Sequence, residues 1–156
     1  MERFYSGIGD ELILWVKQTA WLHGAPKDRD GKSGEKSRLE KMRDKDVTPL
    51  LPRNSAPYLT DWLFEIGPTS AGSMGEGPLG YRDFAAWQSI SGVELMPWEA
   101  SLLRRLSIEY AVTRHKAEDQ AFPAPYSGEV DDVVVNRQQV AKQVDAMFGK
   151  LKGKRG

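Results

Sequence analysis

The chain has no cysteine, only two histidines and no net charge, and each shortage narrows the functions open to it. Without thiols it cannot form disulfides, use a thiolate nucleophile or bind zinc through sulfur. Basic and acidic residues number 22 each, which argues against holding nucleic acid by bulk charge, because neutralising phosphates needs a basic surface. The lack of cysteine suits a reducing cytoplasm.

Long hydrophobic runs are also missing. The longest run, Leu12–Val16, makes about one and a half helical turns, whereas a membrane helix needs roughly 20 apolar residues. The N-terminus carries charge at Glu2 and Arg3 and lacks the apolar centre of a signal peptide. We therefore expect no membrane partner, and the length of 156 residues favours one domain.

Five segments carry apolar residues at helical spacing and predict helices. The strongest pattern covers residues 97–117, where Pro97 occupies a first-turn position. Proline and glycine mark the boundaries of the others, as in Ser55–Pro57 before the second segment and Gly92 after the third. The remaining predicted helices are residues 10–22, 57–66, 80–91 and 137–150.

Two segments between these helices predict irregular structure. Residues 27–46 contain eight basic and six acidic residues and only two apolar ones, so burial cannot offset the entropy of ordering them. A basic arm that folds on a partner is the alternative, and the near balance of charge weakens it. Residues 67–80 hold five glycines and two prolines, which predicts a mobile loop. A phosphate-binding loop needs a preceding strand and a Gly-Lys-Ser/Thr sequence, and this segment has neither.

The predicted fold is all-α, a small helical bundle with a flexible charged linker and a detachable C-terminal helix. An N-terminal amphipathic helix occupies residues 1–23, and a charged, disordered linker follows at 24–54. The helical core covers residues 55–118. A Pro/Gly-rich link and a C-terminal amphipathic helix take up residues 119–156.

Catalytic chemistry has little support in the sequence. His23 and His115 lie far apart beside predicted helix ends, where a cation interacts favourably with the helix dipole. A metal site needs several ligands converging on one of them, and no strand–turn–helix nucleophile elbow is present. We expect no enzyme activity, no metal and no cofactor.

Candidate partner-binding residues lie on the aromatic helices and on the C-terminal segment. The three central tryptophans are either core residues of the bundle or part of a binding surface, where tryptophan is enriched. The apolar face of the C-terminal helix either packs on the bundle or enters a partner's groove. The candidates are Trp62, Trp87, Trp98, Leu102, Tyr110, Val140, Val144 and Phe148.

The central run resembles a known family. An aromatic helix (Tyr58–Glu65) precedes a glycine-rich loop, then a helix ending in Trp87 and Gly92, and then Met96-Pro97-Trp98-Glu99 leading into an apolar helix. This order, over about residues 56–112, is similar to that of the tail assembly chaperones of tailed bacteriophages, which are encoded before the tape-measure gene. The N-terminal helix with its charged linker and the separate C-terminal helix depart from the family's simple pattern.

The resemblance implies a non-enzymatic role in viral morphogenesis. Such a protein binds the long helical tape-measure protein, keeps it soluble and recruits tail tube protein in the host bacterial cytoplasm during phage assembly. A tape-measure protein exposes apolar helical faces that aggregate unless they are covered. Self-association of the chaperone stays open.

Two other classes of function remain as alternatives. A virion structural or head–tail connector protein has the same helical core and stays in the particle. A DNA-binding regulator uses residues 81–91 and 97–117 as a helix-turn-helix. Trp98 and Glu99 oppose the second alternative, because a bulky aromatic and an acid stand where phosphate or base contacts are expected. Nucleic acid is therefore an unlikely partner on this pattern.

Overall fold

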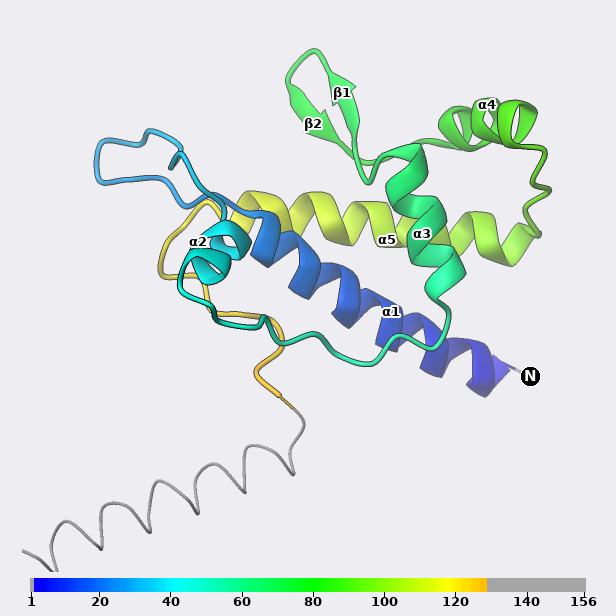
Figure 1. The fold of residues 1–156 in the computed structure, drawn as a ribbon. Helices are drawn as coiled ribbons and strands as arrows, with labels where there is room; N and C mark the ends of the chain where they lie inside the picture. Colours follow the sequence, from blue (N-terminus) through cyan, green and yellow to red (C-terminus); the bar gives the residue numbers. More distant parts are fainter. Residues whose placement is uncertain (1, 129–156) are drawn as a thin grey trace, which may run out of the picture. The chain divides into compact units, whose positions relative to one another are not determined.

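The structure, a computed structural model, describes residues 2–128, with side chains from Ser6 onward (Figure 1). Within these residues the fold is mostly helical, with five helices and one two-stranded hairpin. The helical prediction therefore holds in the main, and the hairpin corrects the all-α expectation. The predicted helix at 137–150 lies outside the described residues.

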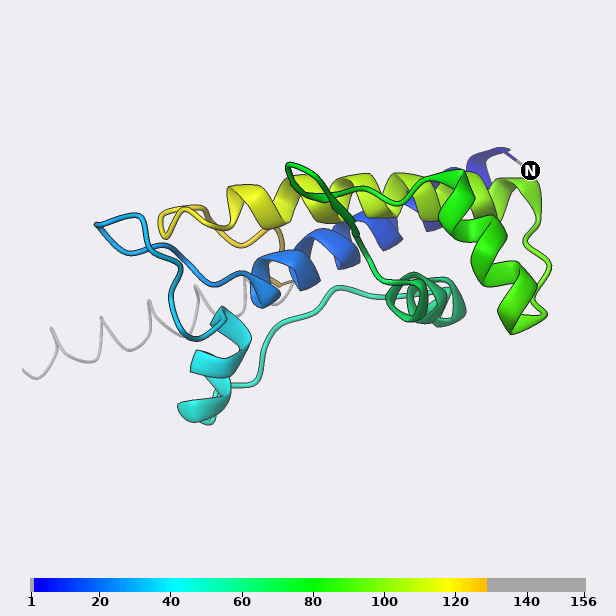
Figure 2. The same cartoon turned by 90° about the horizontal axis from the view of Figure 1, so that it is seen from above.

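Two parallel helices, α1 (Glu2–His23) and α5 (Pro97–Lys116), form the centre of the fold and lie side by side in Figures 1 and 2. Gly9 faces Leu102 near their starts, and Gly24 faces Ala117 beyond their ends. The buried side chains between them and α3 are Leu12, Val16, Ala20, Leu103, Leu106 and Tyr110.

The central place of α1 differs from the predicted separation of the N-terminal helix from a core at residues 55–118. Helix α1 fills the segment 1–23 assigned to it and begins at Glu2, well before the periodic pattern at residues 10–22. Gly7 and Gly9 disfavour a helix locally, and packing against α5 overrides that weak preference. Leu12 and Val16 are fully buried, so α1 contributes to the same core as the predicted bundle at residues 55–118.

Helix α3 (Pro57–Ile66) confirms its prediction and joins the core through Leu59 and Leu63, which are fully buried. Pro57 stands in the first turn, where its missing N–H costs no hydrogen bond. Asn54 holds the helix start in place. Its Oδ1 accepts from the Ala56 N–H at 3.1 Å, and its Nδ2 donates to Thr60 Oγ1 at 2.9 Å.

The predicted disordered linker at 24–54 contains a helix, α2 (Arg38–Asp44). Ser37 and Glu40 form a capping box in which the Ser37 N–H donates to the Glu40 carboxylate at 2.7 Å and the Glu40 N–H donates to Ser37 Oγ at 3.2 Å. The segment is also tied to α1, because Gln18 Nε2 donates to the Leu50 carbonyl at 2.9 Å. Polar contacts to the core thus order a segment that has few apolar residues of its own.

The glycine-rich loop expected to be mobile forms a hairpin of β1 (Ser70–Gly72) and β2 (Gly75–Gly77). The strands are antiparallel, with Ser70 opposite Gly77. Fully buried Ser107 of α5 anchors the loop on both sides: its Oγ donates to the Pro68 carbonyl at 2.7 Å and accepts from the Leu79 N–H at 2.8 Å. These two bonds fix where the hairpin leaves the core.

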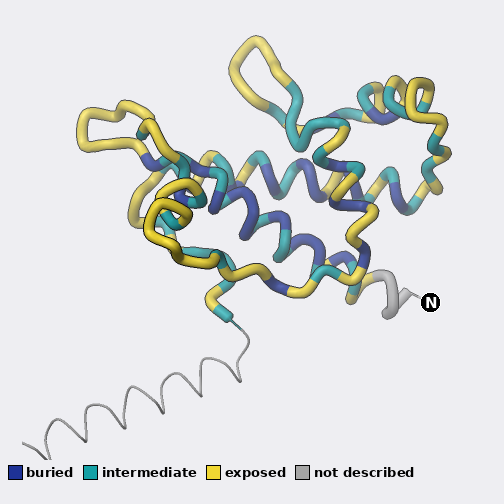
Figure 3. The backbone as a smooth tube through the Cα atoms, in the orientation of Figure 1, coloured by how far each residue is buried: buried dark blue, intermediate teal, exposed yellow. Residues whose placement is uncertain are grey.

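Helix α4 (Tyr81–Ser91) confirms the third prediction. Asp83 accepts from the Gly80 N–H at 2.7 Å at its start, and Gly92, in the left-handed conformation with φ of 73°, ends it. Of its side chains only Phe84 is buried. Figure 3 accordingly shows buried positions recurring along α1, α3 and α5, and mostly partly or fully exposed backbone at α4.

The first compact unit extends from Met1 to Tyr126, beyond the predicted boundary at residue 118. Three polar contacts explain the extension. Trp21 Nε1 donates to the Phe122 carbonyl at 2.9 Å, the Tyr126 N–H donates to Gln18 Oε1 at 3.0 Å, and Arg38 donates to the Asp119 carbonyl at 2.9 Å. The stretch 119–126 therefore belongs to the helical unit. Among the described residues, no helix combines the length and apolarity needed to cross a membrane.

Candidate partner-binding surface

Five large apolar residues of α3, α4 and the turn before α5 are grouped here as the aromatic surface: Tyr58, Trp62, Trp87, Ile90 and Met96. Ring contacts connect the first three. The Tyr58 and Trp62 rings meet edge to face with centroids 5.0 Å apart. The Trp62 and Trp87 rings lie 5.7 Å apart at an angle of 57°. Ring contacts of this kind add stabilisation beyond that of area burial.

Three members of the aromatic surface are widely open to solvent. Ile90 is 88% exposed, Met96 57% and Tyr58 42%. Single exposed apolar residues are normal on a protein, whereas a connected group of large ones marks an interaction site. Trp62 and Trp87 are half-buried, so the aromatic surface combines two partly packed side chains with three exposed ones.

Buried Glu99 links Tyr58 to the N-terminus of α5. One carboxylate oxygen accepts from the Met96 N–H at 2.9 Å, and the other accepts from the Tyr58 hydroxyl at 3.2 Å. Glu99 therefore positions two members of the aromatic surface. An acid at this position also interacts favourably with the helix dipole.

The predicted site residues separate into four groups. Trp62 and Trp87 belong to the aromatic surface. Trp98 and Leu102 are half-buried and pack against the core, Leu102 facing α1 at Gly9. Tyr110 is a core residue only 5% exposed, which corrects its assignment as a partner contact. Val140, Val144 and Phe148 lie outside the described residues.

Tyr110 is buried because its hydroxyl has an internal partner. It lies 2.8 Å from Nδ1 of His23, the last residue of α1. Phe64 meets both rings edge to face, at 5.7 Å from Tyr110 and 5.9 Å from His23. Burial lowers the pKa of His23, and the positive charge of Arg114 lowers it further. His23 therefore acts as a neutral hydrogen-bonding group in the core and is no exposed helix-end cation.

We expect the free energy of unfolding to fall as the pH drops below about 6.5. The folded His23 has a lowered pKa, so in this range the unfolded state binds a proton that the folded state resists, and stability decreases as pH falls. Urea titrations at several pH values measure the slope. His23→Gln removes it, and His115→Gln, which replaces a histidine with an 85% exposed side chain, leaves it in place. An equal slope in His23→Gln contradicts this account.

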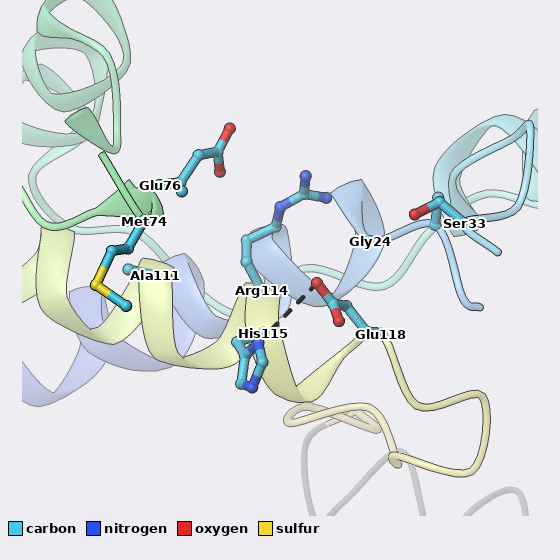
Figure 4. A pocket seen from close by; sticks show the side chains of 10 residues that line it. Gly24, Ser33, Met74, Glu76, Ala111, Arg114, His115 and Glu118 are labelled. Atoms are coloured by element: carbon cyan, nitrogen blue, oxygen red, sulfur yellow. Dashed lines mark ion pairs between the residues drawn. The ribbon is translucent and has the colours of Figure 1, made fainter. Parts of the chain in front are cut away.

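A separate polar cleft of about 460 Å³ lies between the end of α1, the hairpin turn and the last turns of α5 (Figure 4). Arg114 and Glu118 rise into it from the α5 side, and Glu76 faces it from the hairpin. Arg114 donates to the His23 carbonyl, and Lys27 pairs with Glu118. These charges hold neighbouring segments together, and no group of three metal-ligating side chains occurs among the described residues.

No protein-family model matches the chain, and searches of curated proteins and of solved structures returned no significant match.

Proposed function

We propose that the protein is a tail assembly chaperone of a tailed bacteriophage, which binds the tape-measure protein and aids tail tube assembly in the host cytoplasm. The aromatic surface is the observation that carries the proposal. It offers exposed apolar groups on two helices and an adjoining turn, three of its members being joined by ring contacts, which suits reversible covering of an apolar helix face. The resemblance over residues 56–112 supports the same function.

The binding needs neither a nucleotide nor a metal in this proposal. A long client with repeated apolar faces presents many weak sites, and avidity holds the complex. The helix-turn-helix alternative is less well supported, because Glu99 in the first turn of α5 is buried and bonded to Tyr58. A recognition helix presents its N-terminal residues to the groove.

Co-expression with the tape-measure protein of the same phage tests the proposal. We expect the wild-type chain to recover a soluble complex in a pull-down. Ile90→Lys combined with Met96→Lys places two charges in the aromatic surface, and we expect recovery to fall at least tenfold, about 1.4 kcal/mol or more of binding. The fold is retained because both side chains are largely exposed.

A matched control places the same charges elsewhere. Val47 and Val112 are 49% and 45% exposed and lie outside the aromatic surface. Val47→Lys combined with Val112→Lys should recover the client as the wild type does. Absence of any complex, with the protein instead found in purified particles, favours the structural virion component.

A further inference from the structure

We infer that the indole N–H of Trp87 is a hydrogen-bond donor used by the bound partner, so that the aromatic surface selects a helix with a polar acceptor beside its apolar stripe. The inference rests on the proposed function and names the chemistry of the partner. Among the described side chains, Trp87 Nε1 is the one buried polar atom without a hydrogen-bond partner.

An unpaired buried donor is costly, and native proteins keep few of them. Two acceptor side chains of this part of the fold bond other groups. Gln88 Oε1 accepts from the Leu95 N–H at 2.7 Å, and both oxygens of Glu99 are taken by Met96 and Tyr58. The fold therefore stabilises the N-terminal side of α5 with these acceptors and leaves the Trp87 donor unpaired.

The ring of Trp87 belongs to the aromatic surface, although its N–H is buried. On α4, Trp87 stands between buried Phe84 and Ile90, which is 88% exposed, so its ring forms the border between core and solvent. The ring of Trp87 contacts the ring of Trp62 in α3. A helix that packs across Ile90 and Trp62 covers Trp87 at the same time.

Access to the N–H requires a small movement of the indole or of α4. Helix α4 is suited to such a movement because it buries a single side chain, Phe84, and is bounded by Gly80 and Gly92. The indole nitrogen can only donate, so the partner must supply an acceptor. In a helical partner the main-chain carbonyls are already bonded, which leaves side chains such as Gln, Asn, Ser, Asp or Glu.

The test replaces the N–H and retains the ring. Benzothienylalanine at position 87 keeps a bicyclic ring and has sulfur in place of the N–H, and Trp87→Phe is a second variant made from ordinary amino acids. We expect benzothienylalanine to leave the urea midpoint unchanged or raise it, because an unpaired buried donor is removed and the ring is kept. Trp87→Phe also removes ring area that packs on Trp62 and should lower the midpoint. The affinity of both variants for the co-purified tape-measure protein should fall about 3- to 10-fold.

Trp62→Phe is the matched control. It replaces an indole of the aromatic surface with the smaller phenyl ring and keeps the unpaired N–H of Trp87. A second readout is the Trp87 indole resonance of ¹⁵N-labelled protein, which should move downfield in the complex. Unchanged affinity of both position-87 variants, with full recovery by the wild type, overturns the inference and leaves the proposed function standing. Failure of the wild type to bind the tape-measure protein overturns both.

Discussion

Arg38→Ala should lower the free energy of unfolding by about 3–5 kcal/mol, one of the two largest effects expected in this chain. Arg38 is only 8% exposed although it lies in the most charged segment of the sequence. Burial lowers the pKa of Arg38, and the nearby Asp119 opposes that shift, but a guanidinium stays charged throughout the physiological range. Its removal takes a donor from the Ala117 carbonyl, while the carbonyls of Trp21 and Asp119 keep the main-chain donors Gly24 and Phe122.

The contacts of Arg38 join three parts of the chain. Nη1 donates to the Ala117 carbonyl at 2.7 Å and to the Trp21 carbonyl at 3.3 Å, and Nη2 donates to the Asp119 carbonyl at 2.9 Å. The guanidinium also lies 4.8 Å from the centre of the Trp21 ring. A cation at the C-terminal ends of α1 and α5 interacts favourably with both helix dipoles.

Two variants define the mechanism. Arg43→Ala removes an exposed arginine from the same short helix and should change stability by less than about 0.5 kcal/mol. Arg38→Lys keeps the charge but lacks the fork that reaches separate carbonyls, so it should recover only part of the loss. Urea unfolding followed by tryptophan fluorescence measures all three. A stability loss in Arg38→Ala no larger than that in Arg43→Ala contradicts a central role for Arg38.

Local signals explain why α3, α4 and α5 could be predicted from sequence. Pro57 and Pro97 stand at first-turn positions, and Gly67 and Gly92 follow the last turns, so each boundary is encoded within a few residues. Trp62 and Trp87 of the aromatic surface were also named as candidates, because both lie on helices predicted from the sequence.

Contacts between distant residues explain what the sequence pattern missed. Arg38 binds carbonyls 79 and 81 positions away, and Ser107 reaches Pro68 over 39 positions. No periodicity reveals such pairs. Helix α2 is different, since Ser37 and Glu40 have the spacing of a capping box and provided a readable signal within the charged segment. Tyr110 was misassigned because the sequence pattern of an aromatic residue on a helix face is the same whether its hydroxyl is exposed to solvent or bonded to His23.

Phe84→Ala should cost about 3–5 kcal/mol and should act mainly on α4. Phe84 is 2% exposed and is the only buried side chain of that helix, with Tyr81 packed edge to face on its ring at 6.2 Å. Truncation leaves a cavity that α4 can only partly close. The remaining core of α1, α3 and α5 keeps its own fully buried residues, such as Leu12 and Leu103.

Hydrogen exchange distinguishes local release of α4 from general loss of stability. We expect amides of residues 81–91 to exchange much faster in Phe84→Ala while the central turns of α1 and α5 keep slower exchange. Ile90→Ala, at an 88% exposed position of the same helix, should leave the pattern unchanged. Acceleration spread evenly over α1, α4 and α5 contradicts independent release. Because Trp87 and Ile90 sit on α4, its release should also weaken tape-measure binding in the proposed function, which connects the anchoring of one helix to the integrity of the aromatic surface.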